Sequence, residues 1–284
     1  MMYNHLGHCI FRYTGVKNMN NKKQIAEKWY KTLGFKSEYD KAFYVALEEK
    51  EIFCDSISDY DINSSDGLSN LIHFLYFCES LKLEYEKLGI GEDILIDTLK
   101  DIPRWTDTYT NLKGNLYLGE LGWFRNHLTL RLFKLGRLQF CFEDAPEDYP
   151  SVNVKKGEKI VGIHIPSTRP LDIEECRESI DYARKFLDEF FPEYKYEIFN
   201  CHSWLLDETL ENVMKKESNI LKFQTLFNII SSSPSDAILK YIFTWDTTRE
   251  NLIGKQGTSS FAKSVKEHIL SGGTFYESTG IIIK

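Results

Sequence analysis

The sequence predicts an α/β or α+β protein, in which a helical N-terminal region precedes a mixed sheet flanked by helices. Up to about Gly136, apolar residues recur at three- and four-residue steps, as in amphipathic helices. After Gly136, short segments of alternating apolar residues are separated by helical segments, which favours a sheet with helices packed on it. With 42% hydrophobic and 14% aromatic residues, the chain can build a large core. This composition excludes an intrinsically disordered chain.

The N-terminal region is expected to contain four helices. We expect Asn21 to cap the first, which Gly34 ends, and Asp66 to begin a longer one that Gly89 ends. The expected helices cover residues 21–33, 66–88, 94–99 and 119–135, and Gly136 ends the last. Residues 1–18 precede the first helical pattern and are expected to form a disordered extension.

The C-terminal region is expected to alternate strands with helices. The expected strands are 137–143, 159–165, 196–201, 237–245 and 274–283. The expected helices are 172–191, two short ones capped by Asp207 and Asn219, and 258–270. We therefore predict a helical domain at 19–136 and a sheet-containing domain at 137–284.

Charge and cysteine usage exclude several classes of function. The chain has 35 Lys and Arg against 42 Asp and Glu, a net charge of −7, which argues against a nucleic-acid partner. No apolar run is long enough to cross a membrane. The six cysteines are scattered without a C-x-x-C pair, and no secretory signal precedes them, so we expect free thiols in the cytoplasm. Oligomeric state is left open.

The most informative segment is Lys159–Ile180, where a strand ends, a short loop turns and a helix begins. Backbone amides at a helix start can hold a phosphate, and Ser167, Thr168 and Arg169 add hydroxyl donors and a positive charge. The alternative is a well-capped helix after a turn, since Asp172 and Glu175 have the spacing of a capping box. Spacing alone favours this alternative.

Several separated segments together resemble a bacterial acyltransferase family with a helical N-acyltransferase N-terminal domain and a GNAT-like C-terminal domain. The segments are Leu132–Phe140, His164–Leu171 followed by Glu175 and Cys176, Phe199–Asp207 and Ser218–Phe227. The resemblance implies acyl-CoA or acetyl-CoA as co-substrate, no metal, and an amine acceptor that is a small molecule or a peptide. It places the cofactor at Ile165, Pro166, Ser167, Thr168 and Arg169. This loop lacks the glycines of the wider superfamily, and Pro170 removes one backbone donor.

Three residues are the catalytic candidates. His164, near the end of its strand, suits a general base for an amine, and a buried, hydrogen-bonded core histidine is an equal alternative. Cys201 and Ser203 share a strand face, with His202 on the other, and are expected to line the acyl cleft. A cross-strand pair of His164 with Cys201 or Ser203 is geometrically possible.

A further basic group falls on the helix predicted at 119–135. His127, Arg131 and Lys134 would form a cationic stripe, either docking an adenosine phosphate or, as we favour, forming a solvated face.

The leading hypothesis is an acyl-CoA-dependent acyltransferase that acts on an amine. The alternative is a catalytically inactive GNAT-like binding or regulatory module, supported by the missing glycines. A cysteine-dependent hydrolase would require Cys201 to have a lowered pKa.

Overall fold

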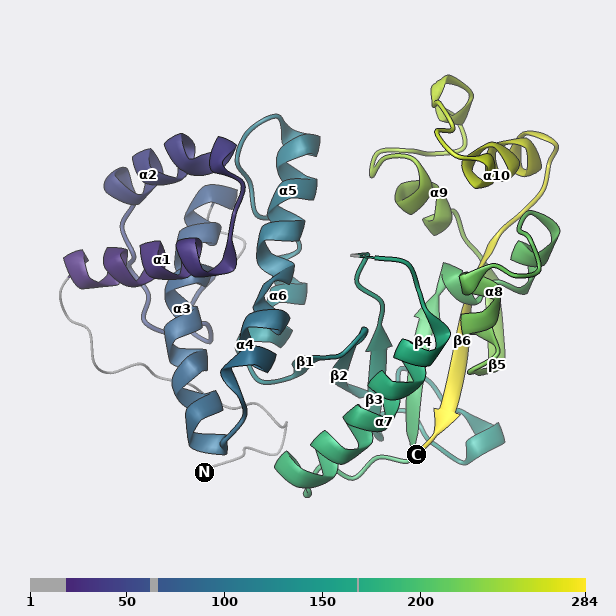
Figure 1. The fold of residues 1–284 in the computed structure, drawn as a ribbon, viewed down its shortest axis with the longest axis horizontal. Helices are drawn as coiled ribbons and strands as arrows, with labels where there is room; N and C mark the ends of the chain where they lie inside the picture. Colours follow the sequence, from purple (N-terminus) through teal and green to yellow (C-terminus); the bar gives the residue numbers. More distant parts are fainter. Residues whose placement is uncertain (1–18, 62–65, 168) are drawn as a thin grey trace. The chain divides into compact units, whose positions relative to one another are not determined.

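The computed structural model describes residues 19–61, 66–167 and 169–284, so the extension predicted at 1–18 lies outside the described residues (Figure 1). The chain divides into two compact units between Lys134 and Leu135. The domain limits predicted at residues 18 and 136 stay predictions. None of the helices within the described ranges combines the length and apolar character needed to span a membrane.

The first unit is built from helices. They are α1 (Met19–Leu33), α2 (Asp40–Glu49), α3 (Gly67–Leu88), α4 (Glu92–Leu99), α5 (Asp101–Lys113) and α6 (Leu121–Leu128), with a 3-10 turn at Ser37–Tyr39. Asp66 caps α3 as predicted, because its carboxylate accepts hydrogen bonds from the backbone of Leu68 and Ser69. Gly89 ends α3 with a φ of 74°, a left-handed conformation that favours glycine. The expected cap Asn21 lies inside α1, which begins two residues earlier.

Two buried histidines belong to this unit. His73 on α3 donates from Nδ1 to the Ser69 carbonyl and accepts at Nε2 from the Phe53 amide. Burial lowers the pKa of His73 from 6.5 to about 4. His127 on α6 is fully buried, and its Nε2 lies 3.1 Å from an Asp101 carboxylate oxygen.

The helix predicted at 119–135 is wrong in its second half. Helix α6 ends at Leu128, and Leu132–Leu135 forms strand β1. Gly136 therefore does not end a helix: with a φ of 71°, it begins the two-residue turn that joins β1 to β2 (Leu138–Asp144). Arg131 and Lys134 lie outside the helix and His127 is buried, so the predicted cationic stripe does not form.

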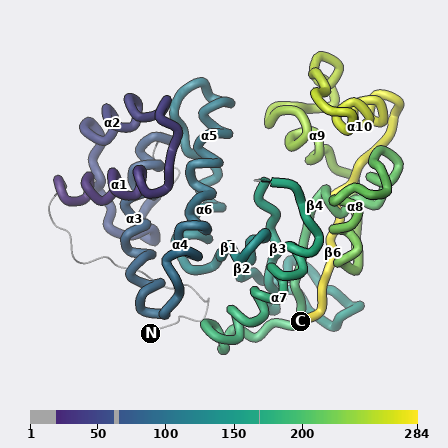
Figure 2. The backbone as a smooth tube through the Cα atoms, viewed as in Figure 1, coloured from purple at the N-terminus to yellow at the C-terminus, as the bar shows by residue number. Residues whose placement is uncertain are grey.

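A six-stranded mixed sheet, with strand order β1-β2-β3-β4-β6-β5, is the centre of the C-terminal part. Its other strands are β3 (Lys159–His164), β4 (Ile198–Ser203), β5 (Asn228–Pro234) and β6 (Tyr276–Ile283), and its helices are α7 (Ile173–Phe190), α8 (Asn219–Gln224), α9 (Ala237–Ile242) and α10 (Ser260–Leu270). Short 3-10 turns lie at Pro150–Val152, Trp204–Leu206, Glu208–Asn212 and Leu252–Gly254. Strands β3 and β4 are parallel, and β6 inserts antiparallel between β4 and β5. The backbone of β6, in yellow, runs beside β4 (Figure 2). This architecture confirms the predicted fold class.

Two predictions in this unit are wrong: the strand at 237–245, and the helix cap at Asn219, because Ser218 caps α8 instead. Residues 237–245, predicted as a strand, contain α9 instead, whose Ile238 and Leu239 are buried with Trp204 and Phe275. The fifth strand is the serine-rich segment Asn228–Pro234, which lies at the sheet edge. An edge strand can be polar and can end in proline, because one side of it pairs with no neighbour.

The two faces of the sheet have different environments, because successive side chains on a strand point to opposite faces. We call one the α7 face: there Phe142 stacks on Tyr194, and the Arg184 guanidinium of α7 lies over Phe199. We call the other the His164 face. The strand registers place on it Gln139, Cys141 and Glu143 of β2, Ile160, Gly162 and His164 of β3, Ile198, Asn200 and His202 of β4, and Glu277, Thr279 and Ile281 of β6.

Candidate active site

A histidine–carboxylate pair lies on the His164 face. His164 Nε2 is 2.8 Å from Glu143 Oε1, and the two side chains are 35% and 31% exposed. Since a carboxylate only accepts hydrogen bonds, this contact puts the proton of a neutral imidazole on Nε2 and leaves Nδ1 as the basic nitrogen. His164 is therefore a partly exposed histidine paired with a carboxylate, and its predicted role as a general base stays a prediction.

Gly162 provides the space that Glu143 occupies. A Cβ atom at residue 162 would lie 2.4 Å from the Glu143 carboxylate, closer than any real contact. The Glu143 side chain therefore lies across the β3 backbone at Gly162 and reaches His164 from the neighbouring strand. Only glycine permits this path.

Cys141 adds a third potential ligand beside this pair. One ligand atom each of Cys141, Glu143 and His164 lies within 4.8 Å of the others. Thiolate, carboxylate and imidazole are the ligands that Zn²⁺ accepts. Attack of an amine on a thioester does not require a metal, so the trio is compatible with metal-free acyl transfer.

Cys201 and Ser203 lie on the α7 face, opposite His164. Cys201 is 1% exposed, and burial raises the pKa of its thiol. The Ser203 hydroxyl accepts a hydrogen bond from the Leu205 amide and caps the turn at Trp204–Leu206. The cross-strand pair of His164 with either residue is therefore not formed, and the raised thiol pKa argues against a cysteine-dependent hydrolase.

The parallel strands β3 and β4 pair over a short length only. The paired residues are Val161 with Phe199 and Gly162 with Asn200, whereas β3 continues to His164 and β4 to Ser203. Beyond this pairing His202 instead contacts β6, where its Nδ1 lies 3.0 Å from the Thr279 hydroxyl. His164 thus lies where two neighbouring strands cease to pair.

Arg137 organises the loop that follows β3. Its side chain is 3% exposed and donates hydrogen bonds to the carbonyls of Pro166, Arg169 and Pro170, at 3.0, 2.9 and 3.3 Å. A guanidinium has several donors in a fixed plane, which lets one side chain hold three carbonyls. Arg137 therefore holds three carbonyls of this glycine-free loop in place.

The residues predicted to bind the cofactor have different environments. Pro166 is buried and Ile165 half-buried, Ser167 is exposed, and Thr168 lies outside the described residues. The exposed Arg169 pairs with Glu175. Asp172 accepts hydrogen bonds from the amides of Glu174 and Glu175, so it caps α7. Of the predicted capping box, the helix cap by Asp172 therefore forms, while the Glu175 side chain pairs with Arg169.

Sequence reasoning missed Glu143 and the role of Arg137. Glu143 was part of a predicted strand, and the alternation of Gln139, Cys141 and Glu143 opposite Phe140 was available as a signal. Nothing in the local sequence links Arg137 to a loop about thirty residues away, because that contact depends on the β1–β2 turn and the sheet register.

Comparisons with known proteins place the chain in a family. Residues 132–282 match the model of the GNAT-like C-terminal domain, and residues 35–130 match that of the N-acyltransferase N-terminal domain. None of the curated proteins matches the chain significantly.

Solved structures of acyltransferases share the fold. An acyltransferase in complex with decanoyl-CoA and teicoplanin, and one with CoA and 10C-teicoplanin, each align with a TM-score of 0.68 at 19% identity, covering 99% of this chain and 91% of theirs. A complex with decanoyl-CoA aligns with a TM-score of 0.67 at 19% identity, covering 97% and 89%.

The family matches confirm the predicted family and enzyme class. The GNAT-like model alone covers residues 132–282 of 284, more than half of the chain, and the N-acyltransferase model covers much of the rest. This protein therefore belongs to the acyltransferase family that joins an N-acyltransferase N-terminal domain to a GNAT-like C-terminal domain.

Proposed function

We propose that this protein transfers an acyl group from acyl-CoA to an amine of a small-molecule acceptor. The observation that carries the proposal is the Glu143–His164 pair, half-exposed at the point where β3 and β4 cease to pair. The proposal is supported by an acyltransferase of similar fold whose structure is a complex with decanoyl-CoA and teicoplanin, that is, with an acyl-CoA and a small molecule. The five described cysteines are buried and form no disulfide with one another, which is compatible with a reducing cytoplasm.

In this proposal His164 is the general base. The nitrogen of a neutral amine attacks the thioester carbon, a C–N bond forms, and the amine proton passes to Nδ1 of His164. The tetrahedral intermediate then breaks its C–S bond, and the leaving CoA thiolate takes the proton from the His164 imidazolium, which regenerates the base. Glu143 is a positioning residue, because it holds the Nε2 proton and stabilises the imidazolium that forms.

The loop held by Arg137 would carry the phosphates of acyl-CoA. The proposed donors are the loop amides, the Ser167 hydroxyl and the Arg169 guanidinium, within the segment 165–169 that the sequence predicts to hold the cofactor. Phosphate binding would compete with Glu175 for Arg169, since the two side chains are paired. Cys201 and Ser203 have no role in proton transfer, because they lie on the opposite sheet face.

Isothermal titration with acetyl-CoA and decanoyl-CoA, followed by an assay of thiol release with primary amines, tests the function. We expect His164→Ala to lower kcat by about 10²–10⁴-fold, the usual contribution of a general base, with acyl-CoA affinity unchanged. Glu143→Gln should lower kcat more than it raises KM, and should remove the single imidazole tautomer of His164 in ¹⁵N NMR spectra. Glu178→Gln, an exposed change on α7, is the matched control. Unchanged kcat in the His164 variant would refute the role of the base.

An inactive binding module is the second candidate. The capping of α7 by Asp172 and the pairing of Arg169 with Glu175 favour it, because both occupy groups that a phosphate would need. The absence of heat and of thermal stabilisation with either acyl-CoA would support this module and overturn the transferase.

A further inference from the structure

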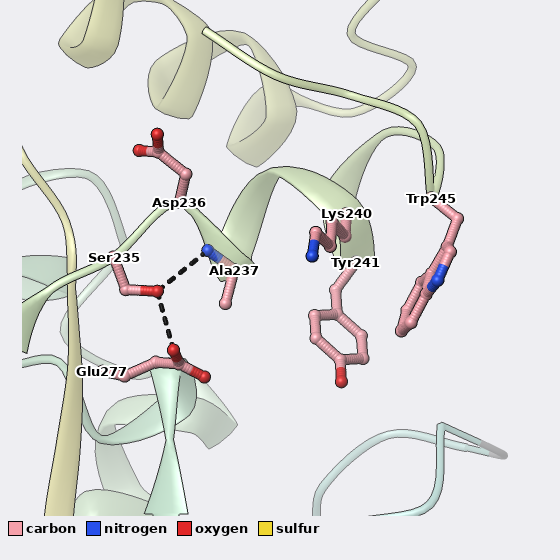
Figure 3. A pocket seen from close by; sticks show the side chains of 7 residues that line it. All are labelled: Ser235, Asp236, Ala237, Lys240, Tyr241, Trp245 and Glu277. Carbon is pink, nitrogen blue, oxygen red and sulfur yellow. Dashed lines mark hydrogen bonds between the residues drawn. The ribbon is translucent and has the colours of Figure 1, made fainter. Parts of the chain in front are cut away.

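A pocket of about 340 Å³ lies in the C-terminal unit, and none of the loop residues that the cofactor proposal uses lines it (Figure 3). Its lining residues are Ser235, Asp236, Ala237, Lys240, Tyr241, Trp245 and Glu277. Its volume is at the lower end of the range typical of small-ligand sites, about 300–1,000 Å³. The pocket therefore suits one ring-sized part of a ligand.

Aromatic side chains form one wall of the pocket. Tyr241 is 53% exposed, and its ring lies 5.3 Å from that of Trp245 in an edge-to-face arrangement. The buried Trp204 stacks on Tyr241 at a centroid distance of 6.0 Å. Since Tyr241 is held by two neighbours and still half-exposed, it presents a fixed aromatic surface suited to stacking.

Opposite this wall lies a carboxylate. Ser235 donates a hydrogen bond of 2.7 Å to one oxygen of Glu277, and the other oxygen points toward Lys240 and Tyr241 (Figure 3). The Ser235 hydroxyl also accepts a bond from the Ala237 amide, so the Glu277 side chain is fixed to the start of α9. Glu277 is thus a preorganised acceptor facing the aromatic wall.

The charges of the pocket balance. Asp236 is paired with Arg249 at 2.7 Å, which leaves Glu277 and Lys240 as one negative and one positive lining group. A pocket with no net charge favours an uncharged ligand part. A carboxylate acceptor next to aromatic rings then favours an aromatic ring that carries a hydroxyl donor.

The pocket lies on the same side of the sheet as His164. Glu277 and Thr279 are two residues apart on β6, and Thr279 contacts His202 of β4, the strand next to β3. From strand spacings of about 4.8 Å and a rise of about 3.4 Å per residue, Glu277 lies at least about 12 Å from His164 along this face. One elongated small molecule can span this distance.

We propose that this pocket is the acceptor subsite, and that it binds a hydroxyaryl group remote from the amine that is acylated. The inference rests on the proposed function for the reacting end of the acceptor. The hydroxyl donates to Glu277, and the ring stacks on Tyr241. The subsite would therefore determine which amines are acylated.

Three amines separate these contributions: 4-(4-aminobutyl)phenol, 4-phenylbutylamine, which lacks the hydroxyl, and octylamine, which lacks the ring. Binding is measured by saturation-transfer NMR and titration on the full chain, without any chemistry. We expect the phenol to bind about threefold to tenfold more tightly than 4-phenylbutylamine, the size of effect of one charge-assisted hydrogen bond at a half-exposed site, and octylamine to bind weakest.

Two variants and their controls assign the contacts. Glu277→Gln should abolish the preference for the phenol, and Tyr241→Ala should weaken both aromatic amines about tenfold, since stacking on a protein aromatic ring contributes on that order. The changes Glu178→Gln and Tyr182→Ala, at exposed positions on α7, should leave both the preference for the phenol and the affinity for the aromatic amines unchanged. Equal binding of the two aromatic amines, or unchanged binding in Tyr241→Ala, would overturn the subsite. If the aromatic amines bind but no thiol is released, the proposed acyl transfer is refuted, while the proposal that this pocket binds a hydroxyaryl group is supported.

Discussion

Replacing Arg137 tests how a loop without glycine can be held in one conformation. Arg137→Met keeps an apolar stem and removes the donors for the three loop carbonyls. A hydrogen bond from a charged donor contributes about 1.5 kcal/mol at the lower end. With two short bonds and one at 3.3 Å, we expect the free energy of unfolding to fall by about 3–4 kcal/mol. Arg137→Lys should fall in between, because one ammonium lacks the planar fork of the guanidinium.

The assay combines thermal unfolding with titration of decanoyl-CoA. For a unit of about 150 residues, a loss of about 3 kcal/mol lowers Tm by roughly 6–12 °C. The affinity for decanoyl-CoA should fall because the loop loses its fixed conformation. In contrast, kcat at saturating acyl-CoA should change little, because the Glu143–His164 contact does not involve Arg137. An Arg137→Met variant with wild-type Tm and wild-type affinity would show that the loop does not depend on Arg137.

Three further predictions concern individual groups. Gly162→Ala should lower kcat at least tenfold with a small change in Tm, since the new Cβ displaces the flexible Glu143 side chain from His164; unchanged kcat would contradict that path. Zn²⁺ should inhibit by binding Cys141, Glu143 and His164, and it should inhibit more weakly when Cys141→Ser removes the thiolate, measured as the inhibition constant for each form; equal inhibition constants would refute this site. Below pH 6.5 His73 is protonated in the unfolded chain, whereas in the folded chain it takes up its proton only near pH 4. The free energy of unfolding should therefore fall as the pH falls, by up to roughly 3 kcal/mol between these two pH values. Urea titrations at several pH values test this, because His73→Gln should lose this part of the pH dependence.

The elements with strong periodicity were predictable from sequence, and the exceptions have physical causes. The capped helices α3 and α7 and the strands β2, β3 and β6 lie close to their predicted ranges. Residues 237–245 are apolar enough for a buried strand, but tertiary packing against Trp204 and Phe275 selects a short helix. Residues 132–135 continue the apolar pattern of α6, yet they form a strand because the two-residue turn that begins at Gly136 joins them to β2.

The candidate site was predictable only in part. His164 could be proposed from its place at a strand end, but its partner Glu143 lies 21 residues earlier and depends on the β2–β3 register. The β3–β4 register places His164 and Cys201 on opposite faces of the sheet, and the local sequence does not determine that register. Contacts between strands require knowledge of which residues face each other, and that information is not local.

The burial of the cysteines has a practical consequence for measuring this enzyme. Cys54, Cys78, Cys141, Cys176 and Cys201 are all buried, so a thiol reagent in solution reaches none of them in the folded state. The CoA thiol released in each turnover would then be the reactive sulfur in the assay once Cys9→Ser removes the remaining cysteine. A disulfide reagent can therefore report turnover continuously, and a rise in its background signal would report unfolding in the same experiment.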